Sequence, residues 1–157
     1  DVSHLLKTIV DIYDVTDRGR DVRVTLKDEL PAGTKILGHD ERLGQVFRNL
    51  IDNAISFSKD GDEITITAQL HHAFARVTVE DAGPGIPPDN LESIFERFYT
   101  ERPGETFGKN SGLGLSIARQ ITQNAGGRIW AENRPPHIPG QTSGGARFVV
   151  ELPAIHA

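Results

Sequence analysis

The chain has 157 residues and a formal charge of −5, because 17 lysines and arginines stand against 22 aspartates and glutamates. This length fits one domain with a sizeable hydrophobic core, and the acidic balance argues against binding to nucleic acid or to an anionic membrane surface. The absence of cysteine excludes disulfide scaffolds, zinc fingers and thiol catalysis. No apolar run reaches the ~20 residues of a membrane span, and no signal-peptide pattern opens the chain. Because methionine is absent even at position 1, we expect a domain excised from a longer protein.

Hydrophobic periodicity predicts a helix, a strand and a turn in the first part of the chain. Apolar residues within 2–13 recur at steps of three and four, so they share one helical face. Residues 22–26 alternate between apolar and polar, as expected for a half-buried strand. The Pro-Ala-Gly sequence at 31–33 predicts a turn, and residues 36–37 predict a short edge strand.

The middle of the chain combines a long amphipathic helix with a hairpin. Asp40 can cap a helix that extends to about residue 57 and has one apolar face. That face consists of Leu43, Val46, Phe47, Leu50, Ile51 and Ala54. After a turn at 59–62, residues 64–70 and 76–80 alternate as the two strands of a hairpin.

The second half begins with a loop rich in glycine and proline at 81–88. A short helix is predicted over 91–99. Residues 100–111 contain few apolar side chains, so we expect a mobile loop there. Residues 112–125 predict a helix that ends at the glycine pair 126–127.

Two last strands are predicted at 128–131 and 146–152, joined by a loop over 135–145. Helices and strands are therefore interleaved, while the strand pairs include hairpins. This pattern predicts an α/β fold, a two-layer α/β sandwich in which a mixed sheet has helices on one face. We expect residues 1–157 to form a single domain.

Two glycine-bearing segments are candidates for nucleotide binding. Asp81-x-Gly83-x-Gly85 follows a predicted strand, and Gly112-x-Gly114 precedes a predicted helix. Glycine lets the backbone approach a ligand closely, and a helix N-terminus offers free N–H groups to phosphate. Neither segment fits the P-loop or the Rossmann fingerprint. The alternative for each segment is an ordinary structural turn.

A pair of asparagines on the long helix is a further candidate. Asn49 and Asn53 are four residues apart, so they project from one helical face that borders the apolar one. Amide oxygens are hard ligands that suit Mg²⁺ and its phosphate partners. The alternative is a pair of core amides that are satisfied by the backbone.

Five segments together resemble the ATP-binding catalytic domain of bacterial sensor histidine kinases, in the same superfamily as gyrase and Hsp90. In the order that the family shows, they are NLIDNA (49–54), DAGPGI (81–86), FERFY (95–99), SGLGLSIARQI (111–121) and GGARFVVELP (144–153). The stretch over 98–121 is also similar to ChvG-type kinases of α-proteobacteria. The resemblance covers nearly the whole chain and implies the Bergerat (GHKL) fold.

The resemblance implies a role for each matching residue, with ATP and Mg²⁺ as ligands. Asp81 would accept a hydrogen bond from the adenine amino group, and Asn53 would hold Mg²⁺ beside Asn49. Residues 100–111 would form the ATP lid, in which Arg102 and Lys109 are candidate phosphate contacts or, alternatively, solvated loop charges. Gly83 and Gly85 would let the backbone approach the purine, Ile86 and Tyr99 would line its pocket, and Gly112 and Gly114 would donate N–H groups to phosphates. The complete implied ATP site is Asn49, Asn53, Asp81, Gly83, Gly85, Ile86, Tyr99, Arg102, Lys109, Ser111, Gly112, Leu113, Gly114 and Leu115.

The residue at position 49 separates activities within this superfamily. ATPases that are similar to this chain carry a glutamate there, whereas an asparagine cannot accept a proton from water at neutral pH. The resemblance therefore implies weak hydrolysis and transfer of the γ-phosphate to a histidine, catalysed by positioning and charge neutralisation. Asn49 and Asn53 are the catalytic candidates.

The acceptor histidine is expected outside this chain. Of the six histidines, only His39 lies in a sequence that faintly resembles a phosphoacceptor motif, but it lacks the expected proline and directly precedes the long helix. The resemblance implies a histidine-bearing helical hairpin upstream, through which the parent protein forms a homodimer. It also implies a response regulator as partner, a cytoplasmic location in a protein anchored in the inner membrane, and no membrane contact by this domain.

Three positions depart from the family pattern. Ser56 replaces a phosphate-binding lysine, Ala146 replaces a threonine near the adenine pocket, and Ala82 replaces an asparagine. The change at Ser56 motivates an alternative function, a non-catalytic ATP-binding switch module. A serine/threonine kinase or ATPase relative is a third alternative, which the asparagine at position 49 disfavours.

Overall fold

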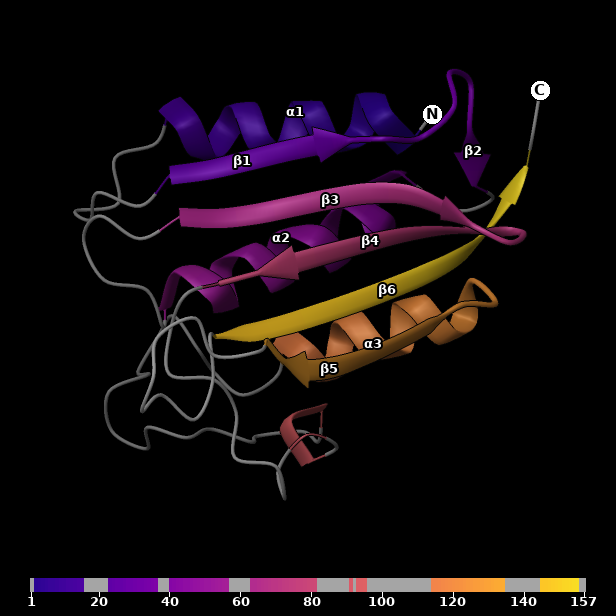
Figure 1. Ribbon diagram of the computed structural model, residues 1–157. Helices are drawn as coiled ribbons and strands as arrows, with labels where there is room; N and C mark the ends of the chain where they lie inside the picture. Colours follow the sequence, from indigo (N-terminus) through magenta and orange to yellow (C-terminus); the bar gives the residue numbers. More distant parts are fainter. Residues whose placement is uncertain are drawn as a thin grey trace.

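The computed structural model describes residues 2–15, 23–36, 40–56, 63–81, 91, 93–95, 114–134 and 145–155 (Figure 1). Its elements in chain order are α1 (Val2–Val15), β1 (Arg23–Asp28), β2 (Lys35–Ile36), α2 (Asp40–Ser56), β3 (Glu63–His71), β4 (Phe74–Glu80), the 3-10 helix η2 (Ser93–Phe95), α3 (Gly114–Asn124), β5 (Arg128–Asn133) and β6 (Ala146–Ile155). The predicted mixed sheet with interleaved helices is confirmed. No helix in the described ranges is long and apolar enough to cross a membrane.

The strands form one mixed sheet whose longest member is β6. The first four strands across the sheet are β1, β3, β4 and β6, and β6 also pairs with β5 and with the short β2. Only the pairing of β1 with β3 is parallel among these described strands, and all other pairs are antiparallel. The predicted hairpin is β3–β4, which turns at His72 with a positive φ of 56°.

The α-helices that the structure describes, α1, α2 and α3, lie on one face of this sheet. Figure 1 shows α1 behind β1, α2 behind β3 and β4, and α3 behind β6 and β5. The central helix α2 contacts both other helices, so the helices form one layer and the sheet forms the other.

Alternation of apolar residues explains why the sheet presents this face to the helices. Alternate residues of β3, β4 and β6 are apolar and most of them are buried, which places these side chains on the same face of the pleated strands. They pack against the apolar face of α2, whose six predicted core residues are all buried. At the centre, Phe47 of α2 is 1% exposed.

The glycine pair after α3 ends that helix as predicted. Gly126 adopts a φ of +82°, a left-handed conformation that glycine takes without strain. The N–H of Gly127 then donates to the carbonyl of Thr122 at 2.9 Å, which is the bond pattern of a Schellman cap. The chain reverses here and enters β5.

Some boundaries differ from the predicted ones. β5 continues to Asn133 and β6 to Ile155, because the β5–β6 and β2–β6 ladders extend past the apolar runs. The predicted helix over 91–99 is wrong where the structure describes it: Leu91 lies in a turn and residues 93–95 form a 3-10 helix, while 92 and 96–99 lie outside the described residues.

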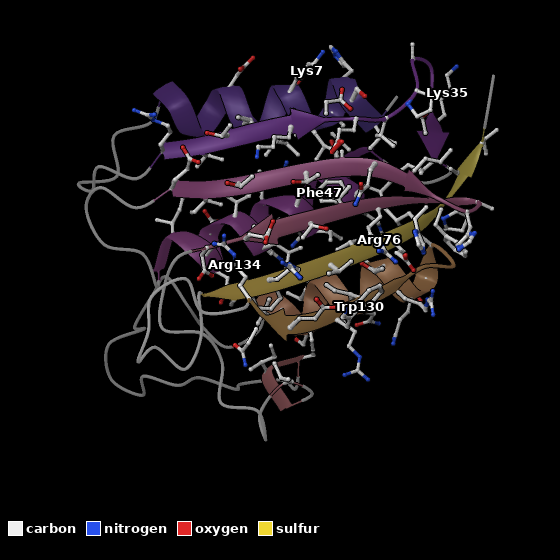
Figure 2. The ribbon with its side chains drawn as sticks, viewed as in Figure 1. Lys7, Lys35, Phe47, Arg76, Trp130 and Arg134 are labelled. Atoms are coloured by element: carbon white, nitrogen blue, oxygen red, sulfur yellow. The ribbon has the colours of Figure 1, made fainter. Side chains whose placement is uncertain are left out.

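The other face of the sheet carries arginines and carboxylates, and we call it the open face (Figure 2). Glu151 of β6 lies there, yet its side chain has no exposed area because Arg76 of β4 and Arg128 of β5 cover it. Arg76 Nε and Arg128 Nη2 donate to its two oxygens at 2.8 and 2.7 Å. Both guanidinium groups also lie over the Trp130 ring, 5.7 and 5.8 Å from its centre.

These contacts determine the protonation state of Glu151. Burial alone would raise the pKa of this carboxyl, but the hydrogen bonds from Arg76 and Arg128 outweigh burial and hold the pKa below its usual value. Glu151 is therefore an ionised carboxylate inside a cluster of two arginines and one tryptophan.

Candidate functional site

The first site residue, Asp81, lies directly after β4 and is buried, with 2% of its surface exposed. Its N–H donates to the carbonyl of Ala146 at 3.0 Å, so the β4–β6 ladder continues by one residue. The N–H of Ala146 in turn donates to Asp81 Oδ1 at 3.1 Å. A buried carboxylate held in this way is an oriented acceptor for a ligand that brings its own N–H donors.

The second site residue, Asn49, lies on α2 and is half-buried. Its Nδ2 donates to the carbonyl of Gly114 at 3.0 Å, across 65 positions of sequence. A carbonyl can only accept, so this contact fixes which end of the amide is NH₂ and which is oxygen. The bond joins α2 to the first residue of α3.

The side chain of Asn49 also packs close to the backbone of Gly114. A Cβ built on Gly114 would lie 3.9 Å from the Cγ of Asn49, which is ordinary van der Waals contact. Asn53, one turn further along α2, is also half-buried. The predicted common face for the two asparagines is therefore consistent with their similar exposure.

The elements that carry these residues meet at one end of the sheet. Figure 1 shows the C-terminal ends of β4 and α2 and the N-terminus of α3 at the same end of the molecule. Three segments far apart in sequence, at Asn49–Asn53, Asp81 and Gly114, thus belong to one region. Leu115 of α3 is half-buried and packs against the hydrophobic core.

The remaining predicted site residues lie outside the described residues, so their roles stay predictions. They are Gly83, Gly85, Ile86, Tyr99, Arg102, Lys109, Ser111, Gly112 and Leu113, together with the predicted lid over 100–111. The same applies to Ala82, to His39 and to the side chain of Ser56. Ala146 is buried at 5% exposure, and its backbone contacts Asp81 as described above.

Arg134 is a residue of this region that belongs to none of the five motif segments. Its Nη1 donates to the backbone carbonyl of Asp81 at 2.8 Å, and its Nε lies 3.2 Å from Oε2 of Glu80. Nothing in the sequence pattern marks it, because the contact joins the end of β5 to the end of β4 across 53 positions.

A second arginine, Arg147, pairs with carboxylates of both neighbouring strands. Its Nη2 lies 3.0 Å from Oε2 of Glu80, and its Nη1 lies 3.2 Å from Oε2 of Glu132. Burial would lower the pKa of Arg147, but the hydrogen bonds and charges of these two carboxylates outweigh it and raise the pKa. The strand ends beside Asp81 are therefore held together by ion pairs.

Among the described residues of this region, few side chains could bind a metal ion. In the described ranges, no group of three or more histidine, cysteine, aspartate or glutamate side chains could hold a metal. Asn53 offers one amide oxygen, which fits Mg²⁺ held mainly by phosphate oxygens and water rather than by a protein cage.

Comparison with curated proteins gives relatives among sensor kinases. The chain is 45% identical over 161 residues to the sensor protein ChvG of Agrobacterium fabrum, covering 98% of this chain and 27% of that protein. It is 36% identical to the signal transduction histidine-protein kinase BaeS of Escherichia coli, covering 82% of this chain and 26% of that protein. The chain thus spans about a quarter of the length of these curated relatives.

Solved structures share the fold over the whole chain. The mycobacterial sensor histidine kinase MprB matches with a TM-score of 0.80 at 26% identity, covering 100% of this chain and 97% of that one. Full-length ShkA in complex with AMPPNP matches with a TM-score of 0.80 at 27% identity, covering 100% of this chain and 31% of that one. The histidine kinase ThkA in complex with the response regulator protein TrrA matches with a TM-score of 0.77 at 28% identity, covering 98% of this chain and 40% of that one.

The family itself follows from a match that covers most of the sequence. Residues 38–156 fit the family model described as histidine kinase-, DNA gyrase B- and HSP90-like ATPase. The matched range contains Asn49, Asp81 and Gly114, the residues that the structure gathers at one end of the sheet. The chain therefore belongs to the family of histidine kinase-, DNA gyrase B- and HSP90-like ATPases.

Proposed function

We propose that residues 1–157 are the ATP-binding and catalytic domain of a sensor histidine kinase. The domain binds Mg·ATP and transfers the γ-phosphate to a histidine of the parent protein. The observation that carries this proposal is that a buried carboxylate, Asp81, lies at the same end of the sheet as the hydrogen bond between Asn49 and Gly114. The ShkA match supports it, since that kinase was solved with AMPPNP.

At the adenine end, Asp81 is the group that recognises the base. Its carboxylate, held by the N–H of Ala146, accepts a hydrogen bond from the 6-amino group of adenine. The glycines Gly83 and Gly85 let the backbone approach the purine, and Ile86 and Tyr99 line the pocket. A carboxylate selects adenine because it offers only acceptors to that edge of the base.

At the phosphate end, α2 and α3 supply the binding groups. Asn53 holds Mg²⁺, and the ion neutralises phosphate charge when it is bound. The N-terminus of α3 turns backbone N–H groups toward the phosphates, with Gly112 and Gly114 permitting the close approach. The lid over 100–111 adds Arg102 and Lys109 as cationic contacts, which supplies the charge that Ser56 lacks.

Asn49 explains why transfer to a histidine is favoured over hydrolysis. An amide has no basic atom at neutral pH, and its NH₂ is already engaged by Gly114. Water therefore receives no general-base assistance from this residue. A neutral imidazole nitrogen attacks the γ-phosphorus with its own lone pair, and the bond from that phosphorus to the bridging oxygen breaks to release ADP.

The partners follow from the same proposal. The acceptor histidine belongs to a helical hairpin upstream of this chain, through which the parent forms a homodimer. A response regulator then receives the phosphate, as the ThkA–TrrA complex supports. The domain works in the cytoplasm as part of a protein anchored in the inner membrane, without touching the membrane itself.

Labelling of the full-length parent protein with ATP radioactive at the γ-phosphate tests the transfer. We expect an acid-labile, base-stable phosphohistidine in the wild type and none in Asn53→Ala. ATP binding by the parent without any phosphohistidine would instead support a non-catalytic switch module, the alternative that Ser56 motivates. Rapid release of free phosphate by the isolated domain would support an ATPase.

A further inference from the structure

Arg134 ties together three strands at the end of the sheet where Asp81 lies (Figure 2). Its own N–H donates to the carbonyl of Gly145 at 2.8 Å, so the residue continues the ladder between β5 and β6. Its side chain crosses to the end of β4, where Nε pairs with Glu80 and Nη1 donates to the Asp81 carbonyl. One residue therefore fixes the place where the chain leaves β4.

These contacts are shielded and directional. The side chain of Arg134 is 23% exposed and that of Glu80 is 19% exposed, so both groups are partly shielded from water. Hydrogen bonds from a charged guanidinium are stronger than neutral ones, and the planar group holds its N–H donors at fixed angles. A lysine has the same charge but cannot present two donors to adjacent groups in this geometry.

Asp81 is thereby restrained from two sides. The N–H of Ala146, on β6, holds one carboxylate oxygen, and Arg134, beyond β5, holds the carbonyl of the same residue. The first contact restrains the side chain, whereas the second restrains the backbone from which that side chain projects. Recognition of a ligand donor needs the acceptor within about 0.5 Å of the productive position, so both restraints affect binding.

We infer that Arg134 is a positioning residue for base recognition: it holds the backbone of Asp81 so that the carboxylate meets the 6-amino group of adenine. This inference rests on the proposed function, since it concerns the same site. It predicts that Arg134 contributes to the preference for adenine, a property that an arginine with a purely structural role would leave unchanged.

Arg147 offers a matched control on the neighbouring strand. It pairs with the same oxygen of Glu80, at 3.0 Å, and its side chain is 31% exposed, close to the value for Arg134. Its second partner is Glu132 rather than the Asp81 carbonyl. Arg147→Gln therefore removes a similar ion pair from Glu80 while the contact from Arg134 to Asp81 remains.

The experiment compares two nucleotides in calorimetric titrations with Mg²⁺: ATP, and purine riboside triphosphate, which has a hydrogen in place of the 6-amino group. We expect Arg134→Gln to weaken ATP binding about five-fold to ten-fold and to change binding of the other nucleotide less than about two-fold. Arg147→Gln should leave the ratio of the two affinities unchanged. Arg134→Lys should resemble Arg134→Gln, and it serves as the test variant if the glutamine variant does not fold.

Asp81→Asn in the same titrations separates this inference from the proposed function. If Arg134 acts through Asp81, the double variant Asp81→Asn/Arg134→Gln loses no more preference for ATP than Asp81→Asn alone. Suppose that Asp81→Asn abolishes the preference for ATP over purine riboside triphosphate but Arg134→Gln keeps it. This result would overturn the inference and leave the proposed function standing. A wild type with no preference for ATP would overturn both the inference and the assignment of Asp81 as the group that recognises the 6-amino group of adenine.

Discussion

The two faces of the sheet are stabilised by different interactions. The face under the helices is apolar and continuous, and each strand contributes to it through its own alternation of buried residues. The open face is held by pairs of opposite charge, such as Arg76–Glu151 and Glu80–Arg147, that join different strands. The first face specifies the fold, whereas the second joins neighbouring strands at separate places: Arg76–Glu151 lies near the start of β4, and Glu80–Arg147 lies at its end, beside Asp81.

The site lies where these two faces meet. Asp81 is buried at the end of a strand whose inward residues belong to the apolar face. Its carbonyl nevertheless accepts a hydrogen bond from Arg134, whose ion pair with Glu80 belongs to the open face. Substitutions on the helix-covered face should therefore lower the free energy of unfolding most, whereas on the open face the loss of Arg134 should also affect the position of Asp81.

The largest effect is expected for the helix-covered face. Phe47→Ala removes a side chain that is 1% exposed at the centre of the core, and it should lower the free energy of unfolding by about 3–5 kcal/mol. Chemical denaturation followed by circular dichroism measures this loss. A loss below about 1 kcal/mol would mean that the core around α2 is not packed as described.

On the open face, the largest effect is expected at Glu151. Glu151→Gln keeps the shape but turns an NH₂ group toward one of the two arginines, so we expect a loss of about 1–3 kcal/mol in unfolding free energy. The only tryptophan, Trp130, lies beside both arginines, so its fluorescence follows this face during denaturation. Stability equal to that of the wild type would contradict the role assigned to this cluster.

The same residue gives a prediction for pH. Because the pKa of Glu151 is lower in the folded chain than its ordinary value of 4.5, its contribution is fully present above pH 4.5 and is lost as pH falls through the folded pKa. The unfolding free energy of the wild type should therefore fall more steeply below about pH 4.5 than that of Glu151→Gln. Parallel curves for the two proteins between pH 7 and pH 3 would show that the carboxylate is not stabilised in the folded state.

The smallest effect is expected for Arg147→Gln. The side chain is 31% exposed and its ion pairs with Glu80 and Glu132 are partly solvated, so the loss in unfolding free energy should be below about 1 kcal/mol. Added salt should narrow the difference from the wild type, since screening weakens such pairs. A loss as large as that for Glu151→Gln would show that both ion-pair clusters matter equally.

Sequence alone predicted the helix-covered face well, because its signal is local. The spacing of the six apolar residues in 40–56 predicted the buried face of α2, and the alternation in 64–70 and 76–80 predicted the β3–β4 hairpin. The glycine pair 126–127 predicted the end of α3. Each of these signals repeats within a few residues, so no knowledge of distant contacts is needed.

The open face could not be predicted, because its contacts depend on register. Arg76 meets Glu151 across 75 positions, and Arg134 meets Asp81 across 53. A shift of one residue between β4 and β6 would put Arg76 and Glu151 on opposite faces of the sheet. In the same way, the two asparagines were expected on one helical face, but the bond from Asn49 to Gly114 required the packing of α2 on α3.

The central claim is that Asp81 recognises adenine in an ATP site. Its most direct test is calorimetric titration of Mg·ATP into the wild type and Asp81→Asn. The asparagine keeps an oxygen for the N–H of Ala146 but replaces the second acceptor with NH₂, so the fold should persist. We expect the wild type to bind and the variant to bind at least about ten-fold more weakly. Equal affinity in the two proteins, or no binding by the wild type, would contradict the claim.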